Sequence, residues 1–340
     1  MRTSFDICYA LTTESWPKLH TFKEVVDMEN GIYYEMLDDV YVHVKARFLG
    51  GCGITYKADG TLLKGWCNGR QQFYNKVLAG EYSNVIQLTS PPLPDKIYED
   101  ETICILARMW GHNYTHFTLE IMDKLLFAES IGFRGRYMLF HSSFAEEFLR
   151  LFGIDEKRIL WISAEDDDKI LFVKHALEIE GFTLGSDKGL PTLENYVKDM
   201  KPLCTSIQTY PARLYVKRIG RRKLLGIDDI LASFGFETMI PEEHTVAEEA
   251  EYFRHADVVF LPHGAAMANT IFMRKGTAII ETFPANWTNL MTIHVAHYKA
   301  INYRMLVESC LGNNQKNPQV DDYTISRLLV QHTLEEYAVS

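Results

Sequence analysis

The sequence contains little cysteine and lacks any apolar run long enough to cross a membrane. Its 340 residues include six cysteines, and no two of them form a Cys-x-x-Cys pair. This argues against a disulfide framework and against a zinc knuckle. A bilayer-spanning helix needs about 20 consecutive apolar residues, and no segment approaches that length. The N-terminus carries acidic residues early and has no long apolar stretch, so we expect no signal peptide and a cytoplasmic location.

Positive charge is also scarce. Lysine and arginine number 35 against 45 aspartates and glutamates, which gives a net charge of −10 at neutral pH. Such a chain is a poor general binder of nucleic acid or anionic lipid, because it cannot neutralise their phosphates. Hydrophobic residues make up 47% of the sequence, which excludes disorder as its main state. Any anion-binding site must therefore rest on a local basic patch, and one is present at 213–223.

The order of apolar runs and turns predicts two α/β halves. Residues 32–67 are rich in β-forming residues and contain a turn at Asp59-Gly60. Beyond residue 100, short apolar strands alternate with helical patterns, which is typical of parallel sheets covered by helices. The predicted strands and helices lie at 102–108, 114–130, 136–141, 143–152, 158–163, 169–175, 213–217, 227–234, 236–240, 245–255, 257–261, 265–274, 277–282, 287–299 and 302–307.

These elements predict two α/β halves built on parallel sheets, preceded by a β-rich N-terminal segment. Ligands of such sheets bind at the carboxyl ends of the strands, which places the site in the cleft between the domains. The expected segments are a β-rich part joined to the first domain at 1–100, the first domain at 101–190, a connection at 191–211, the second domain at 212–310 and a helical tail at 311–340.

A turn of small residues follows the strand 257–261. Gly264 and Ala265 have almost no side chain, so a ligand could approach their backbone closely. The helix that starts there presents unpaired N–H groups, which suit a phosphate. His263 could donate to a phosphate oxygen, and Asn269 could orient the ligand or the loop. The alternative is that the small residues only pack a helix tightly onto the sheet.

The basic patch lies at the end of the strand 213–217. Arginine binds phosphate with two parallel hydrogen bonds, and a concentration of positive charge at a strand end favours an anionic ligand. For any one of these residues a solvated surface position is the simpler interpretation. The patch consists of Arg213, Lys217, Arg218, Arg221, Arg222 and Lys223.

A histidine and a carboxylate share one helix face near the start of the helix 114–130. His116 and Glu120 are four residues apart, and such a pair can exchange protons near neutral pH. Asn113 lies one turn earlier and His112 in the preceding loop, where both could orient an acceptor. The alternative is that Asn113 caps the helix and His116 belongs to the core.

Two further acidic positions have functional interpretations. Glu281 ends the strand 277–282 and could accept hydrogen bonds from ribose hydroxyls, or form a salt bridge. Asp166 and Asp168 have the Asp-x-Asp spacing that can hold a divalent metal on a nucleotide diphosphate. Acidic triplets of this kind are more often exposed turns.

Taken in order, these motifs resemble glycosyltransferase family 61, which includes plant xylosyl- and arabinosyltransferases, animal enzymes that extend O-linked sugars, and many bacterial members. The first family motif matches Asn113, Tyr114, His116, Phe117 and Glu120. The second matches Lys217-Arg218 and 221–224, with Gly226 in place of the usual asparagine. The third matches 262–265, Asn269, Lys275-Gly276 and Glu281, with Ala266 in place of a second glycine.

The resemblance, which covers about 103–308, implies a GT-B-like fold of two Rossmann-like domains with a β-rich N-terminal extension. It also implies an inverting transferase that needs no metal or other cofactor. Arg218 and Arg222 would then neutralise the leaving diphosphate, His263 with 264–266 would hold phosphate, and Glu281 would hold ribose. Glu120 or His116 would take the proton of the acceptor hydroxyl. The first domain would bind the acceptor and the second the nucleotide sugar.

The expected partners are a nucleotide sugar, with a UDP-sugar favoured, and a glycan acceptor from polysaccharide or lipopolysaccharide synthesis. Nucleic acid is not expected. Peripheral association with the inner face of a membrane stays open, as does the oligomeric state. Two other functions compete with this one. The first is a metal-dependent transferase built on Asp166 and Asp168, and the second is a non-catalytic module that binds a nucleotide or another anion.

Overall fold

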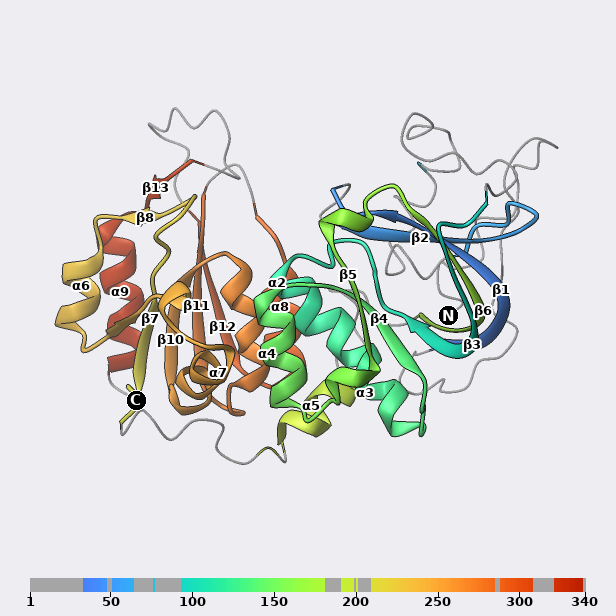
Figure 1. Ribbon diagram of the computed structural model, residues 1–340. Helices are drawn as coiled ribbons and strands as arrows, with labels where there is room; N and C mark the ends of the chain where they lie inside the picture. The colour runs from blue at the N-terminus through green and yellow to red at the C-terminus, as the bar shows by residue number, and fades with distance from the viewer. Residues whose placement is uncertain are drawn as a thin grey trace, which may run out of the picture.

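The computed structural model describes residues 33–47, 51–63, 76, 93–180, 191–198, 200, 209–284, 288–307 and 321–338. They form a mixed α/β structure with two main sheets, one in each half of the chain (Figure 1). The predicted α/β class is therefore confirmed. Within these residues, no helix is long and apolar enough to cross a membrane.

The described residues of the first half form six strands and the helices that cover them. Its elements are β1 (Tyr33–Lys45), β2 (Cys52–Lys57), β3 (Lys96–Ile105), α2 (Tyr114–His116), η2 (Phe117–Ile121), α3 (Met122–Ser130), β4 (Arg136–Phe140), α4 (Ser143–Leu151), η3 (Glu156–Arg158), β5 (Ile159–Ile162), η4 (Ala164–Asp166), β6 (Ile170–Glu180) and α5 (Pro191–Lys198).

The sheet of the first half has the order β2-β1-β6-β3-β4-β5. Strands β6, β3, β4 and β5 are parallel, as the alternation of strands and helices predicts. Strand β1 runs antiparallel to both β2 and β6, with Tyr33 opposite Glu180 and His43 opposite Ile170. The β-rich N-terminal part therefore extends this sheet, and β6 is longer than the predicted strand 169–175 because β1 pairs along its whole length.

The second half contains an all-parallel sheet of the order β12-β11-β10-β7-β9. Its elements are β7 (Arg213–Val216), β8 (Leu224–Leu225), α6 (Asp228–Ser233), β9 (Glu237–Met239), η5 (Pro241–Glu243), α7 (Val246–His255), β10 (Val258–Pro262), η6 (Ala265–Phe272), β11 (Ala278–Phe283), α8 (Met291–Tyr298), β12 (Asn302–Val307), β13 (Tyr323–Thr324) and α9 (Arg327–Ala338).

Both faces of the second sheet are covered by helices. Strands β10 and β11 are buried along their whole length, as expected for strands covered on both faces. Helices α6 and α9 lie on the side away from the first half, while α7 and α8 lie toward it (Figure 1). Helix α7 begins at the predicted capping box, in which Thr245 and Glu248 satisfy each other's backbone N–H groups. The predicted C-terminal helical tail contains α9.

One hydrophobic core runs through both halves. It includes Leu119 and Phe148 from the first half and Val246 and Ile271 from the second, all at most 4% exposed. Helices α2 and α4 contact η6 and α7 respectively. The carboxyl end of β3, which leads into α2, therefore faces the carboxyl ends of β7 and β10. Within the predicted connection 191–211, residues 191–198 form α5, while residues 199 and 201–208 lie outside the described residues, as do residues 181–190.

Candidate functional site

A cavity of about 320 Å³ lies where the two halves meet. It is bounded by the start of α2, the loops after β7 and β10, and the start of α8. Six of the predicted site residues line it: Asn113, His116, Arg222, His263, Gly264 and Ala265. Thr115, Arg221, Met267, Asn289 and Met291 complete its wall.

The first side of the cavity carries a histidine–carboxylate pair. Nδ1 of His116 lies 2.7 Å from Oε2 of Glu120. The Glu120 side chain is completely buried and that of His116 is 12% exposed, so only the histidine reaches the cavity. Asn113 caps the helix by accepting hydrogen bonds from the backbone N–H groups of Thr115 and His116. The ring of Trp110 stacks on His116 with its centroid 4.7 Å away, which fixes the plane of the imidazole.

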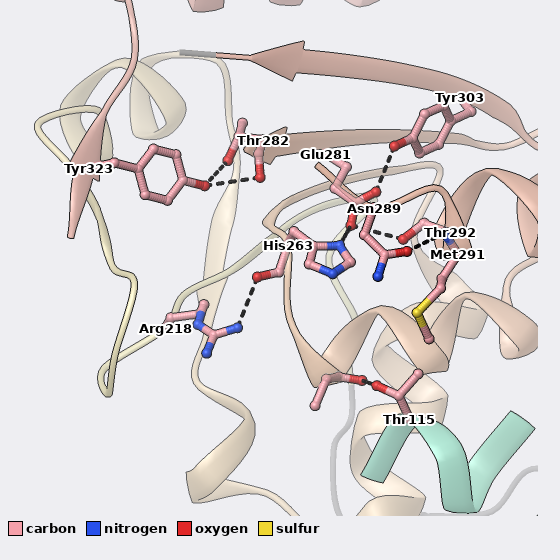
Figure 2. Close-up of polar contacts among 11 residues, drawn as sticks. Thr115, Arg218, His263, Glu281, Thr282, Asn289, Met291, Thr292, Tyr303 and Tyr323 are labelled. Atoms are coloured by element: carbon pink, nitrogen blue, oxygen red, sulfur yellow. Dashed lines mark hydrogen bonds and ion pairs between the residues drawn. The ribbon is translucent and has the colours of Figure 1, made fainter. Parts of the chain in front are cut away.

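The second half of the chain contributes another pair of the same kind to the cavity (Figure 2). Nδ1 of His263 lies 2.5 Å from Oε1 of Glu281. Glu281 is fully buried, and its oxygens also accept hydrogen bonds from the hydroxyls of Thr292, at 2.8 Å, and Tyr303, at 2.7 Å. Burial, and next the charge of Glu281, raise the pKa of Tyr303, which therefore stays a donor. His263, Thr292 and Tyr303 thus hold this carboxylate in place.

Arg218 crosses the loop after β10. Its Nη1 donates to the carbonyl oxygen of His263 at 2.9 Å (Figure 2). Its Nε donates to the carbonyl oxygen of Arg221 at 3.1 Å. A Cβ atom on Gly264 would lie 1.7 Å from Nη1 of Arg218. Since the φ of Gly264 is −179°, which any residue adopts, the guanidinium is what requires glycine here. The sequence predicts that a ligand approaches the backbone of this loop closely. In the structure, the side chain of Arg218 makes that close approach at Gly264.

The arginines are held in a partly desolvated, positively charged site. Burial lowers the pKa of Arg218. Burial, and next the charge of Arg218, lower the pKa of Arg222 to about 10. Both guanidinium groups stay charged at neutral pH. A bound anion stabilises the charged form of such neighbouring cations, because opposite charges at close range attract.

Asn269 joins the two halves instead of lining the cavity. Its Oδ1 accepts a hydrogen bond of 2.8 Å from the hydroxyl of Tyr114, and its Nδ2 donates to Oε2 of Glu249 at 2.6 Å. Asn269 is fully buried. Burial raises the pKa of Glu249 to about 8, so this carboxyl is largely protonated at neutral pH. Close by, the hydroxyl of Thr115 donates to the carbonyl oxygen of Ala265 at 3.1 Å.

The family model for Glycosyltransferase 61 matches residues 82–280, more than half of the chain. The chain belongs to glycosyltransferase family 61. It is thus a glycosyltransferase, and the family implies a sugar donor and a glycan acceptor. No curated protein matches it. Among solved structures, it is similar to a glycerate dehydrogenase related protein from Thermoplasma acidophilum, with 15% identity, a TM-score of 0.20 and coverage of 39% of this chain and 58% of that one.

The acidic triplet of this family 61 glycosyltransferase lies outside the cavity. Asp166 accepts hydrogen bonds from the amino groups of Lys96, at 3.1 Å, and Lys169, at 3.0 Å. Asp168 binds Nζ of Lys45 at 2.5 Å and Nε2 of His43 at 2.7 Å. The described residues include no group of three or more His, Cys, Asp and Glu side chains that could hold a metal. Lysine ammonium groups therefore occupy the positions that a cation would take.

His112 also lies away from the cavity of the family 61 site. Its ring packs against Phe140 with the centroids 4.6 Å apart. Burial lowers the pKa of His112. It lines neither this cavity nor the one described next, while Asn113, predicted beside it, lines the first.

A second cavity, of about 490 Å³, shares Gly264 and Ala265 with the first. Its wall comes from α2, α4, the end of β7, η5, the start of α7 and the loop after β10. Arg218 lines this cavity, whereas Arg222 lines the first. The loop 264–265 therefore separates two hollows of the family 61 glycosyltransferase, with cationic side chains on both sides.

Sequence reasoning missed several residues that shape the site. Thr292 and Tyr303 hold Glu281 from 11 and 22 residues away. Tyr114 reaches Asn269 across 155 residues. Contacts of this range leave no periodic signal in the sequence. Tyr114 does belong to the first family motif, and this membership is the sequence signal that could have marked it as a site residue.

Proposed function

We propose that this protein transfers a sugar, with inversion at the anomeric carbon, from a nucleotide-sugar donor to a hydroxyl of a glycan acceptor. The observation that carries the proposal is that His116, from the first half, and the cationic loop, from the second half, line one cavity. One side can accept a proton, and the other can hold a diphosphate. An inverting displacement needs these two functions on opposite sides of one carbon atom.

His116 acts as the base in this proposal. Its Nδ1 is engaged by Glu120, so the acceptor proton goes to Nε2. The acceptor oxygen then attacks the anomeric carbon, and the bond from that carbon to the phosphate oxygen breaks. Glu120 does not reach the cavity, and it acts by holding the imidazole and stabilising its positive charge. Of the two predicted candidates for the base, the geometry supports His116.

The nucleoside diphosphate leaves toward the cationic loop. Arg218, Arg222 and the backbone N–H groups at 264–266 neutralise its growing charge without proton transfer. Nδ1–H of His263 donates to Glu281, so its Nε2 donates to a phosphate oxygen when the ring carries a second proton as an imidazolium. Glu281 thus acts on the donor through His263, and the ribose contact predicted for Glu281 would require its three hydrogen bonds to rearrange.

We further propose that the two halves work as in a GT-B fold, with the donor on the second half and the acceptor entering from the first. The parallel sheet with its anion-binding loop supports the placement of the donor. A UDP-sugar as donor, and a cell-surface polysaccharide or lipopolysaccharide precursor as acceptor, follow from the resemblance to bacterial family members.

Variants of the histidine–carboxylate pair test this function. His116→Ala should lower kcat by about 10²–10⁴, the usual contribution of a general base, and Glu120→Gln should lower it as well. Donor affinity should stay unchanged in both, because neither side chain contacts the diphosphate. The matched control is His141→Ala, since His141 also pairs with a glutamate, Glu146, at 2.7 Å but lines neither cavity. Normal turnover in His116→Ala would remove it as the base.

The competing binding-module function is tested with a panel of nucleotide sugars. A thermal-shift screen with UDP-, GDP- and CMP-sugars identifies the donor, because a ligand of the native state raises the apparent Tm. The same sugars are then incubated with the protein and assayed for transfer or hydrolysis. Binding with neither reaction would favour the non-catalytic module.

A further inference from the structure

The second cavity lies at the switch point of the parallel sheet. From β7 the chain first adds β9 on one side and then returns to add β10, β11 and β12 on the other side. The order in which strands are added therefore reverses between β7 and β10. Open α/β sheets bind nucleotides in the crevice at this point. The second cavity is lined by Val216 and Arg218 at the end of β7 and by Pro262 and Gly264 at the end of β10. It therefore lies in that crevice and, at about 490 Å³, is the larger of the two cavities.

The two cavities differ in chemistry. The lining of the first contains arginine and histidine but no carboxylate. The lining of the second contains three glutamates, Glu147, Glu242 and Glu249, together with the aromatic ring of Phe144. Carboxylates accept hydrogen bonds from sugar hydroxyls, and an aromatic ring offers a stacking surface to a base.

The geometry of the shared loop decides how a donor would lie. Gly264 and Ala265 line both cavities, so a diphosphate lying over this loop, beside Arg218, would have one end toward each cavity. His116 lines the first cavity and not the second, so the sugar that is transferred belongs in the first. The nucleoside then extends into the second.

Glu242 is the carboxylate best placed for ribose. It is exposed on η5. It is also near enough to Arg218 for its charge to offset part of the fall in the Arg218 pKa that burial causes. Glu249 is bound to Asn269, and Glu147 accepts a hydrogen bond from the backbone N–H of Val246 at 2.7 Å. Glu281 is fully engaged by its three partners His263, Thr292 and Tyr303.

We infer that the second cavity is the nucleoside subsite, with Phe144 against the base and Glu242 accepting hydrogen bonds from the ribose hydroxyls. This inference rests on the proposed function, since it needs a nucleotide-linked donor. It moves the ribose contact from Glu281 to Glu242. It also gives the first half of the chain, through Phe144, a part in donor selection.

Calorimetric titration of the full chain tests the inference. The probes are UDP, GDP, CDP and ADP, with inorganic pyrophosphate as the nucleoside-free control. The preferred nucleoside diphosphate should bind at least about tenfold more tightly than pyrophosphate, as expected for a stacked base. Glu242→Gln and Phe144→Leu should each reduce the ratio of nucleoside diphosphate affinity to pyrophosphate affinity about tenfold. Both should leave the pyrophosphate affinity itself within about twofold.

Neighbouring residues serve as matched controls. Glu243→Gln changes an exposed carboxylate next to Glu242 that does not line the cavity, and it should keep the ratio. Phe152→Leu changes a ring that packs on Phe148 and lines neither cavity, and it should also keep the ratio.

Three outcomes would overturn the inference. One is a ratio that survives both Glu242→Gln and Phe144→Leu. Another is a loss of the ratio only in Asn289→Ala, which alters the first cavity. The third is a lower transfer rate in these variants with unchanged binding of the nucleoside diphosphate, which would mark the second cavity as the acceptor site. Absence of binding by pyrophosphate and all four nucleotides in the unaltered protein would instead contradict the proposed function as well.

Discussion

Gly264 carries a steric constraint that the fold itself does not impose. Its backbone is extended, so alanine fits the local conformation, but the added methyl group would lie 1.7 Å from Nη1 of Arg218. The guanidinium is the far end of a flexible side chain and can move aside. The constraint therefore serves the placement of Arg218 more than the stability of the chain.

The first prediction concerns Gly264→Ala. The displaced Arg218 should weaken binding of UDP or pyrophosphate about tenfold or more, since one charged hydrogen-bonding partner of the phosphate is lost, typically worth about 1.5–3 kcal/mol. The free energy of unfolding should change by no more than about 1 kcal/mol. Titration calorimetry and urea unfolding measure the two quantities. Gly220→Ala is the control, because a Cβ atom there meets no atom within 4 Å, and equal affinities in both variants would contradict the role of Arg218.

The second prediction concerns the acidic triplet. Asp168→Asn should leave transfer activity unchanged, because Asp168 pairs with Lys45 and His43 away from both cavities. The activity of the unaltered protein should also persist in excess EDTA. Loss of activity in EDTA, with recovery on adding Mg²⁺ or Mn²⁺, would restore the metal-dependent alternative.

At the residue scale, the sequence indicates which side chains gather at the site but not how deeply they lie. Asn113, His116, Arg222 and His263 follow strand ends or start helices, and the structure brings them together. The enclosure of Glu281 could not be predicted, because its partners come from α8 and β12. The same holds for Asn269, whose two partners lie on α2 and α7.

At the scale of elements, the bounds of the helix after β3 are predicted well, but the change of helix type in its middle is not. The segment 114–130 is helical throughout, yet Phe117–Ile121 forms a π-helical turn. Residues 117–128 are all buried, so no single apolar face exists whose period could reveal the wider turn. Such turns are rare and often occur at functional sites. Here the turn carries Glu120, the partner of His116. The predicted helix 265–274 also differs in type, since residues 265–272 form the 3₁₀ helix η6.

The third prediction concerns the contact of α7 with η6. The pKa of Glu249 is raised to about 8 in the folded chain from an ordinary value of 4.5. The stabilisation from its protonated form is complete below the ordinary value and is lost as the pH rises through the folded value. Over that window the free energy of unfolding should fall by up to roughly 1.4 kcal/mol per pH unit.

The variant Glu249→Gln isolates this effect. Glutamine stays neutral and can still accept the hydrogen bond from Asn269, so the variant should gain stability over the unaltered protein as the pH rises from 6 to 8. Urea unfolding of both proteins at several pH values measures the difference. A constant difference across this range would show that Glu249 is ionised in the folded chain.

At the scale of the whole molecule, the contacts between the halves set the distance from His116 to the loop at Gly264. Tyr114 and Thr115, which immediately precede His116, bind Asn269 and Ala265 of the second half. The alternation of strands and helices predicts two such halves and the cleft between them. It does not predict the strand order or the antiparallel position of β1, because pairing between distant segments leaves no local pattern.

The fourth prediction concerns Tyr114→Phe. Loss of the hydroxyl leaves the buried Oδ1 of Asn269 without this donor, which should cost about 1–3 kcal/mol of stability. Since the same contact positions the start of α2, kcat should fall, while the affinity for pyrophosphate, which needs no contact with the second cavity that Tyr114 lines, stays unchanged. Urea unfolding, kinetics and calorimetry measure the three quantities. Tyr298→Phe, at a ring that is 36% exposed on α8, is the control. A fall in donor affinity with an unchanged kcat would contradict this positioning role.

The loop at Gly264 has a consequence for the reaction over time. Under the proposed function, Arg218 and Arg222 hold the diphosphate group of the donor, and the same group stays on the leaving nucleotide after the bond breaks. The spent nucleotide therefore keeps every contact that the loop made with the donor and loses only those of the sugar. Its departure would then limit the turnover rate, and accumulated nucleoside diphosphate would compete with fresh donor until another enzyme hydrolysed it.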